Sequence, residues 1–191
     1  MSGDSGRERR QYEALIERAT ALGRVPTAVV HPCDESSVCA AIEAGAAGLI
    51  EPIFVGPTRK MQAAAARAGL DLRRLRIVDQ PHSHAAAARA VALVRQGEAE
   101  LLMKGSLHTA ELMHEVTAHE TGLRTARRIS HVFIMDVPTY HKPLFVTDGA
   151  INITPTLEDK LDICQNAIDL ARALGVAQPR VVILSAVETV T

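Results

Sequence analysis

Residues 27–57 read TAVVHPCDESSVCAAIEAGAAGLIEPIFVGP, and the fold class follows from this stretch. It begins with a short apolar run at 27–31 and continues into an Ala-rich segment that Asp34 can cap. It ends in a second apolar run at 50–55. Neither run alternates with polar residues, as expected of strands that are covered on both faces. A strand, a helix and a strand in this order predict a parallel β-α-β unit.

The same rhythm extends in both directions from this unit. We expect helices over residues 7–22, 57–69, 83–95 and 106–118, and further strands at 75–78 and 100–103. After residue 122 the rhythm changes, and the pattern predicts an antiparallel hairpin of strands 130–136 and 143–147, a helix over 157–174 and a last strand at 180–184. Thr156 and Asp159 form a variant capping box at the start of that helix. The sequence thus predicts an α/β fold with a mainly parallel sheet and flanking helices. Residues 1–140 make most of a first domain, and 141–191 begin a second, incomplete one.

Composition excludes several classes of protein. Hydrophobic residues make up 47% of the 191, so the chain as a whole is not disordered. Aromatic residues make up only 3% and the net charge is −1, which argues against a partner nucleic acid or an anionic membrane surface. No apolar run approaches the length of a membrane span. The three cysteines predict free thiols in a reducing, cytoplasmic compartment, without a disulfide. The eight histidines match no metal-ligand spacing, so we expect no metal site.

Three segments place polar groups where ligands bind in α/β folds, at strand ends and helix starts. Residues 103–109, which include Lys104 and Ser106, suit a phosphate or form an ordinary strand-turn-helix. Arg127 and Arg128 precede a strand, where they form a solvated basic corner or a donor fork for phosphate. The segment 147–152 is either a tight turn or a carboxylate and amide presented to a ligand.

The chain resembles the phosphate acetyltransferase/phosphate butyryltransferase family, and in particular the acyltransferase part of bifunctional enoyl-CoA hydratase/phosphate acetyltransferases. The most specific segment is FVTDGAINITP at 145–155 with Lys160 following, and the others are 48–57, 102–109, 127–132 and 183–188. The resemblance implies a two-domain fold like that of isocitrate and isopropylmalate dehydrogenases, with substrates in the interdomain cleft. It also implies the reversible reaction of acetyl-CoA or another acyl-CoA with phosphate to give CoA and acetyl phosphate or the corresponding acyl phosphate.

The resemblance carries over a set of substrate-binding residues: Lys104, Gly105, Ser106, Thr109, Ser130, His131, Asp148 and Asn152. The family's catalytic Asp and Arg residues lie beyond Thr191, so we expect a C-terminally truncated chain that is inactive by itself. The implied partners are CoA or acyl-CoA and phosphate or acyl phosphate, with CoA as a substrate and no bound cofactor. A homodimer is also implied.

Two alternatives stay open. The chain is a catalytically silent binding or assembly module of the same fold, which turnover measurements would distinguish from an enzyme. Alternatively, it is another enzyme of the fold group, such as an acyl-phosphate-forming enzyme of phospholipid synthesis or a metal-dependent dehydrogenase. The dehydrogenases need an acidic metal cluster, which the sequence lacks.

Overall fold

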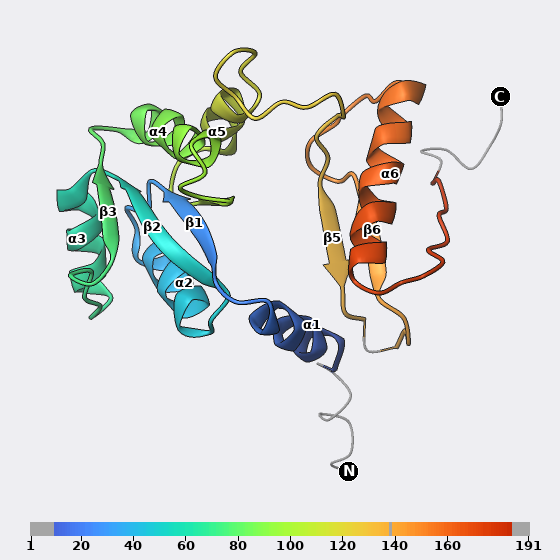
Figure 1. Ribbon diagram of the computed structural model, residues 1–191, viewed down its shortest axis with the longest axis horizontal. Helices are drawn as coiled ribbons and strands as arrows, with labels where there is room; N and C mark the ends of the chain where they lie inside the picture. Colours follow the sequence, from blue (N-terminus) through green and yellow to red (C-terminus); the bar gives the residue numbers. More distant parts are fainter. Residues whose placement is uncertain (1–9, 138, 185–191) are drawn as a thin grey trace, which may run out of the picture. The chain divides into compact units, whose positions relative to one another are not determined.

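The computed structural model describes residues 10–137 and 139–184, which form two compact units (Figure 1). One unit is Ile16–Arg124, and the other combines the described residues of Met1–Leu15 and Thr125–Thr191. The helix expected over 7–22 is present as α1 (Arg10–Ala21), and residues 7–9 lie outside the described chain. The division into domains 1–140 and 141–191 stays a prediction.

The unit Ile16–Arg124 contains the expected parallel sheet. Its strands lie in the order β3-β2-β1-β4 and are all paired in parallel. They are β1 (Val25–Val30), β2 (Ile50–Gly56), β3 (Arg76–Asp79) and β4 (Leu101–Lys104). Because the strands are parallel, their carboxyl ends share one edge of the sheet, where ligands bind in open α/β folds.

Helices cover both faces of this sheet (Figure 1). Val29 and Phe54 are fully buried on the face covered by α2 and α3, whereas Val30 and Val55 are fully buried on the face covered by α4 and α5. These helices are α2 (Glu35–Ala46), α3 (Thr58–Arg67), α4 (Ser83–Arg95) and α5 (Thr109–Val116). Burial of each such side chain contributes about 1.5–3 kcal/mol to the free energy of unfolding. The sheet is therefore a rigid support for the loops at its edges.

Side-chain caps define the starts of α2 and α3. Asp34 accepts a hydrogen bond from the Ser37 backbone N–H at 2.7 Å, which confirms the predicted cap of α2. Helix α3 is capped from a distance, because Asp79 at the end of β3 accepts from both the N–H and the hydroxyl of Thr58, at 2.9 and 2.6 Å. The second cap ties the end of one strand to the start of the preceding helix.

The second unit contains the predicted hairpin and the long helix. Strands β5 (Val132–Met135) and β6 (Leu144–Thr147) pair antiparallel, and α6 spans Leu157–Ala173. The capping box of Thr156 and Asp159 is confirmed, since each side chain accepts the other's backbone N–H. On α6 the residues Leu157 and Leu161 are 76% and 66% exposed.

The prediction of a strand at 180–184 is wrong, because these residues form no strand in the structure. Their apolar sequence fits a strand, but a strand also needs a neighbour to complete its hydrogen bonds. Within the described chain β5 and β6 pair only with each other. Residues 185–188, which end the last segment of the family resemblance, lie outside the described residues. No helix in the described part is long and apolar enough to cross a lipid bilayer.

Candidate functional site

Lys104 lies at the junction of strand and helix that the sequence predicts. It is the last residue of β4, and α5 begins at Thr109. Its ammonium Nζ donates to the carbonyl oxygens of Gly105 at 3.2 Å and Leu107 at 2.9 Å. An ammonium carries three N–H donors, so these two bonds hold the side chain over the loop and leave a third donor for an anion.

Gly105 is required by a close approach of two strand ends. Its N–H donates to the Val30 carbonyl at 2.9 Å. A Cβ at this position would lie 2.5 Å from the Val30 oxygen and 2.7 Å from the His31 oxygen. Both neighbours are backbone atoms, so no side chain can move aside to make room. The glycine thus lets the loop after β4 pack directly against the end of β1.

Ser106 binds the residue that follows β1. Its N–H and its hydroxyl donate to the His31 carbonyl at 3.0 and 2.8 Å, and its Oγ accepts from the Cys33 N–H at 3.2 Å. His31 is not among the site residues predicted from the sequence. The available signal was its position, since a polar residue directly after a buried strand lies at the same edge as Lys104.

Thr109 is the first residue of α5, and its side chain is exposed. The N–H groups of the first turn of a helix have no acceptor within the helix, and the helix dipole places positive potential there. Lys104 and this helix start therefore add two sources of positive potential at one loop.

Asp148 closes the loop after β6. Its Oδ1 accepts from the N–H groups of Ala150 at 3.1 Å and Ile151 at 3.0 Å, and its Oδ2 accepts from the N–H and the side-chain amide of Asn152 at 3.2 and 2.5 Å. Desolvation by itself would raise the pKa of Asp148, but these hydrogen bonds together lower it. Both carboxylate oxygens thus hold the turn. This agrees with the interpretation of the segment 147–152 as a tight turn, one of the two that the sequence leaves open.

Replacing Asp148 by alanine is expected to loosen this loop. Hydrogen exchange at Ala150, Ile151 and Asn152 should become faster by about 10-fold or more, because their N–H groups lose a charged acceptor. The pKa of Asp148 is lowered in the folded state. In the unsubstituted chain, these three N–H groups should therefore be protected from exchange above about pH 4, the ordinary pKa of Asp. Their protection should fall as the pH drops further and the carboxylate becomes protonated. Glu158→Ala removes an exposed carboxylate of the same unit and is the control. Unchanged exchange of these three N–H groups in Asp148→Ala would contradict the role of the Asp148 carboxylate in holding the loop.

Ser130 and Asn152 belong to one hydrogen-bond network. The side-chain amide of Asn166 donates to the Ser130 hydroxyl at 2.8 Å and to the Arg128 carbonyl at 2.9 Å. Arg128 Nε donates to Asn152 Oδ1 at 2.9 Å. Through Asn152 this network reaches Asp148, so three predicted site residues of this unit are brought together.

The two arginines are paired with carboxylates of α6 and its start. Arg127 contacts Asp169 at 2.7 Å, and Arg128 contacts Asp159 at 3.4 Å. Both arginine side chains are about half exposed, and exposed pairs of this kind contribute little stability. The pair thus forms an exposed, ion-paired basic corner, in agreement with the first interpretation, while binding of phosphate by these two guanidinium groups stays a prediction.

His131 is the fourth predicted site residue of this unit. Its ring packs edge-on against Phe133 with 4.2 Å between ring centres, and its carbonyl accepts from the Thr147 hydroxyl at 2.7 Å. Its Nδ1 is buried and has no hydrogen-bond partner within the described chain. The roles of all eight predicted site residues toward substrate stay predictions.

The cysteines and histidines do not form a further centre in the described part. Cys33, Cys39 and Cys164 are free thiols. Burial raises the pKa of Cys33, which keeps that thiol protonated. Within residues 10–137 and 139–184, no group of three His, Cys, Asp or Glu side chains is arranged to hold a metal ion.

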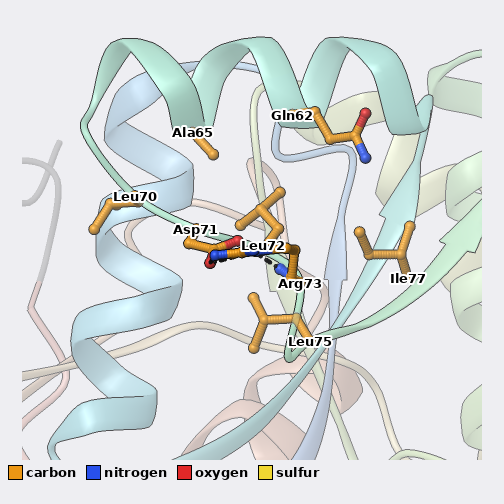
Figure 2. Close-up of a pocket in the computed structure, with 8 residues that line it drawn as sticks. All are labelled: Gln62, Ala65, Leu70, Asp71, Leu72, Arg73, Leu75 and Ile77. Carbon is orange, nitrogen blue, oxygen red and sulfur yellow. Dashed lines mark hydrogen bonds and ion pairs between the residues drawn. The ribbon is translucent and has the colours of Figure 1, made fainter.

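A pocket lies at the opposite edge of the parallel sheet (Figure 2). It is lined by Gln62 and Ala65 of α3, by residues 70–73 and Leu75 of the following connection, and by Ile77 of β3. This connection enters β3 at its amino end, whereas Lys104 and Ser106 follow the carboxyl end of β4. The pocket is therefore separate from the candidate site.

Comparisons with known proteins agree with the resemblance. Residues 82–190 match the family model described as phosphate acetyl/butaryl transferase. The chain is 64% identical over 181 residues to a phosphate acetyltransferase of Rhizobium meliloti, covering 95% of this chain and 57% of that protein. It is 33% identical over 181 residues to a phosphate butyryltransferase of Clostridium acetobutylicum, covering 95% of this chain and 60% of that protein. The chain thus spans little more than half the length of these relatives.

Solved structures of the same fold include a branched-chain phosphotransacylase from Enterococcus faecalis V583. It has a TM-score of 0.71 and 26% sequence identity, covering 87% of this chain and 58% of that one. A phosphotransacetylase from Streptococcus pyogenes matches with a TM-score of 0.71 at 20% identity, covering 86% of this chain and 58% of that one. The predicted α/β fold class is confirmed by these neighbours together with the parallel sheet.

Proposed function

The chain belongs to the phosphate acetyl/butyryltransferase family, and on that basis we propose that it takes part in reversible acyl transfer between coenzyme A and phosphate. In one direction the CoA thiol attacks the carbonyl carbon of an acyl phosphate and phosphate leaves. In the other direction phosphate attacks the thioester and the thiolate leaves. CoA is a substrate in this proposal, and the chain needs no bound cofactor.

The observation that carries the proposal is the loop between β4 and α5. Both CoA and acyl phosphate bear phosphate groups, which cations and free backbone N–H groups bind. The loop offers the third donor of Lys104 and the first turn of α5 at the carboxyl edge of a parallel sheet. We propose that it binds a phosphate group of a substrate, with Gly105, Ser106 and Thr109 forming the surrounding loop.

The predicted residues of the second unit have a different part in the proposal. Asp148 and Asn152 stabilise their own loop, and Ser130 is linked to them through hydrogen bonds. We propose that they form and hold a second substrate-binding surface, to which His131 also belongs. A homodimer, which rests on the family, and a cytoplasmic location, which rests on the cysteine content, also stay proposals.

Replacing Lys104 by alanine tests the proposed binding loop. Calorimetric titration of CoA into the 191-residue chain is expected to show binding that weakens about 10-fold, or about 1.4 kcal/mol, in Lys104→Ala. Lys142→Ala removes an exposed ammonium elsewhere and should leave the affinity unchanged. Equal affinities of the two variants would contradict the role of Lys104. Binding of CoA without turnover under any condition would favour the silent binding module.

A further inference from the structure

His31, which follows β1, lies between the ends of β2 and β4. A Cβ on Gly56, the last residue of β2, would lie 3.3 Å from the His31 Cα and 3.7 Å from Cδ2 of its ring. The Oγ of Ser106, in the loop after β4, lies 3.3 Å from Nδ1 of the same ring. Since β1 is the neighbour of both β2 and β4 in the sheet, these contacts come from opposite sides. The φ of His31 is 55°, a conformation that is rare for a residue with a Cβ and frequent at functional sites.

A lysine lies next to each of these two contacts. Lys104 immediately precedes the glycine of the β4–α5 loop, and Lys60 lies in the first turn of α3 and is exposed. The residue after Lys60 is Met61, whose Sδ would lie 3.4 Å from a Cβ on Gly56. The first turn of α3 is therefore close to the end of β2. In the part of the chain that the structure describes, neither lysine forms an ion pair.

The charge of Lys60 reaches the residues that follow β1. Burial lowers the pKa of His31, and the ammonium of Lys60 lowers it further, by more than the carboxylate of Glu111 or that of Asp34 raises it. Burial raises the pKa of the Cys33 thiol, and the Lys60 ammonium opposes that shift. Lys60 thus contributes positive potential at the end of β1, on the side opposite Lys104.

The two carboxylates near this edge are held by helix starts. Asp34 caps α2 by accepting from the Ser37 N–H at 2.7 Å. Glu111 lies in the first turn of α5, and a hydrogen bond with the Ser83 side chain lowers its pKa. The positive potential at a helix start partly offsets the charge of a carboxylate bound there. The two ammonium groups lack a carboxylate bound to them, so they remain available to an external anion.

The spacing of the strand ends suits an anion with two phosphoryl groups. Neighbouring strands lie about 4.8 Å apart, so the ends of β2 and β4, on either side of β1, are about 10 Å apart. A diphosphate has two phosphoryl groups joined by one oxygen and can offer one of them to each lysine. Lysine binds phosphate as a point charge, so the two contacts need no bidentate geometry.

We propose that Lys60 and Lys104 form a two-cation subsite at the end of β1 that binds a diphosphate group, with one phosphoryl group at each ammonium. Lys60 is thereby a binding residue beyond those that the family resemblance implies. The identity of the natural ligand rests on the proposed function: CoA contains a diphosphate between its nucleotide and its pantetheine part.

NMR titration of the His31 ring tests the position of Lys60 without a ligand. The signals of His31 are identified by their loss in His31→Gln. Lys60→Ala should raise the pKa of His31, because it removes a positive charge that opposes protonation. Arg59→Ala removes the neighbouring cation of the same helix and should change that pKa less. Equal changes in both variants, or no change in Lys60→Ala, would overturn the proposal.

Calorimetric titration with inorganic pyrophosphate tests the subsite itself. The 191-residue chain should bind pyrophosphate more tightly than inorganic phosphate. Lys60→Ala should weaken pyrophosphate binding about 10-fold and phosphate binding less, because only pyrophosphate contacts both ammonium groups. Arg59→Ala should leave both affinities unchanged. No preference for pyrophosphate in the unsubstituted chain, or the same loss in Arg59→Ala as in Lys60→Ala, would overturn the subsite.

CoA and dephospho-CoA, which lacks the 3′-phosphate, separate the phosphate groups of CoA. Both compounds keep the diphosphate, so Lys60→Ala should weaken their binding by the same factor. A loss with CoA alone would assign Lys60 to the 3′-phosphate and overturn the diphosphate contact. If pyrophosphate binds through Lys60 and neither CoA compound binds, the proposed function fails and the subsite stands. If CoA binds equally to Lys60→Ala and to the unsubstituted chain, the subsite fails and the proposed function stands.

Discussion

Gly105→Ala is expected to destabilise the unit Ile16–Arg124 by more than about 3 kcal/mol, because the added methyl group meets backbone atoms rather than movable side chains. The new Cβ would lie 2.5 Å from the Val30 oxygen and 2.8 Å from the His31 carbonyl carbon. Relief requires the β4–α5 loop to move away from β1, which also breaks the bonds between Ser106 and His31. Thermal unfolding followed by circular dichroism measures the effect.

Gly45→Ala is the matched control in the same unit. Gly45 lies in α2, and its Cβ would meet Pro52 at an ordinary 3.4 Å. Alanine is favoured over glycine inside a helix by up to about 1 kcal/mol, so this variant should be as stable as the original chain or slightly more stable. If Gly105→Ala and Gly45→Ala unfold at the same temperature, the close approach of the β4–α5 loop to β1 does not exist.

The second large effect concerns the rate of acyl transfer. In a chimera of this chain with the remaining C-terminal part of the Rhizobium meliloti relative, Lys104→Ala is expected to lower kcat/KM about 100-fold. This exceeds the loss in CoA affinity, because a cation near the phosphate also stabilises charge that develops in the transition state. Lys142→Ala should leave kcat/KM unchanged. A loss in Lys104→Ala no larger than the loss in CoA binding would contradict a role for Lys104 beyond binding.

The core of the parallel sheet could be predicted from sequence because its signals are local. The apolar runs at 27–31 and 50–55, the cap at Asp34 and the capping box at Thr156 each depend on a few neighbouring residues. The strand at 180–184 could not be judged in this way. Its apolar residues satisfy the local pattern, whereas a strand forms only where a partner completes its hydrogen bonds, which local sequence does not report.

In the candidate site, too, local features could be predicted from sequence and long-range contacts could not. The sequence correctly predicts the position of Lys104 at a strand end, because an apolar run followed by a Gly-Ser turn is a local feature. The pairing of His31 with Ser106 and of Arg127 with Asp169 joins residues 75 and 42 positions apart, and is set by packing of whole elements. Gly105 is predicted only as a substrate-binding residue implied by the resemblance, whereas the structure shows that it allows the loop to approach the end of β1.

Thioester formation from acetyl phosphate and CoA, followed by ultraviolet absorbance, tests the proposed acyl transfer most directly. The assay compares the 191-residue chain with the chimera, because the chain spans 57% of the Rhizobium meliloti relative. We predict that the chimera forms acetyl-CoA at an enzymatic rate and that the chain alone does not. A folded chimera that binds CoA and forms no thioester would contradict the proposed acyl transfer.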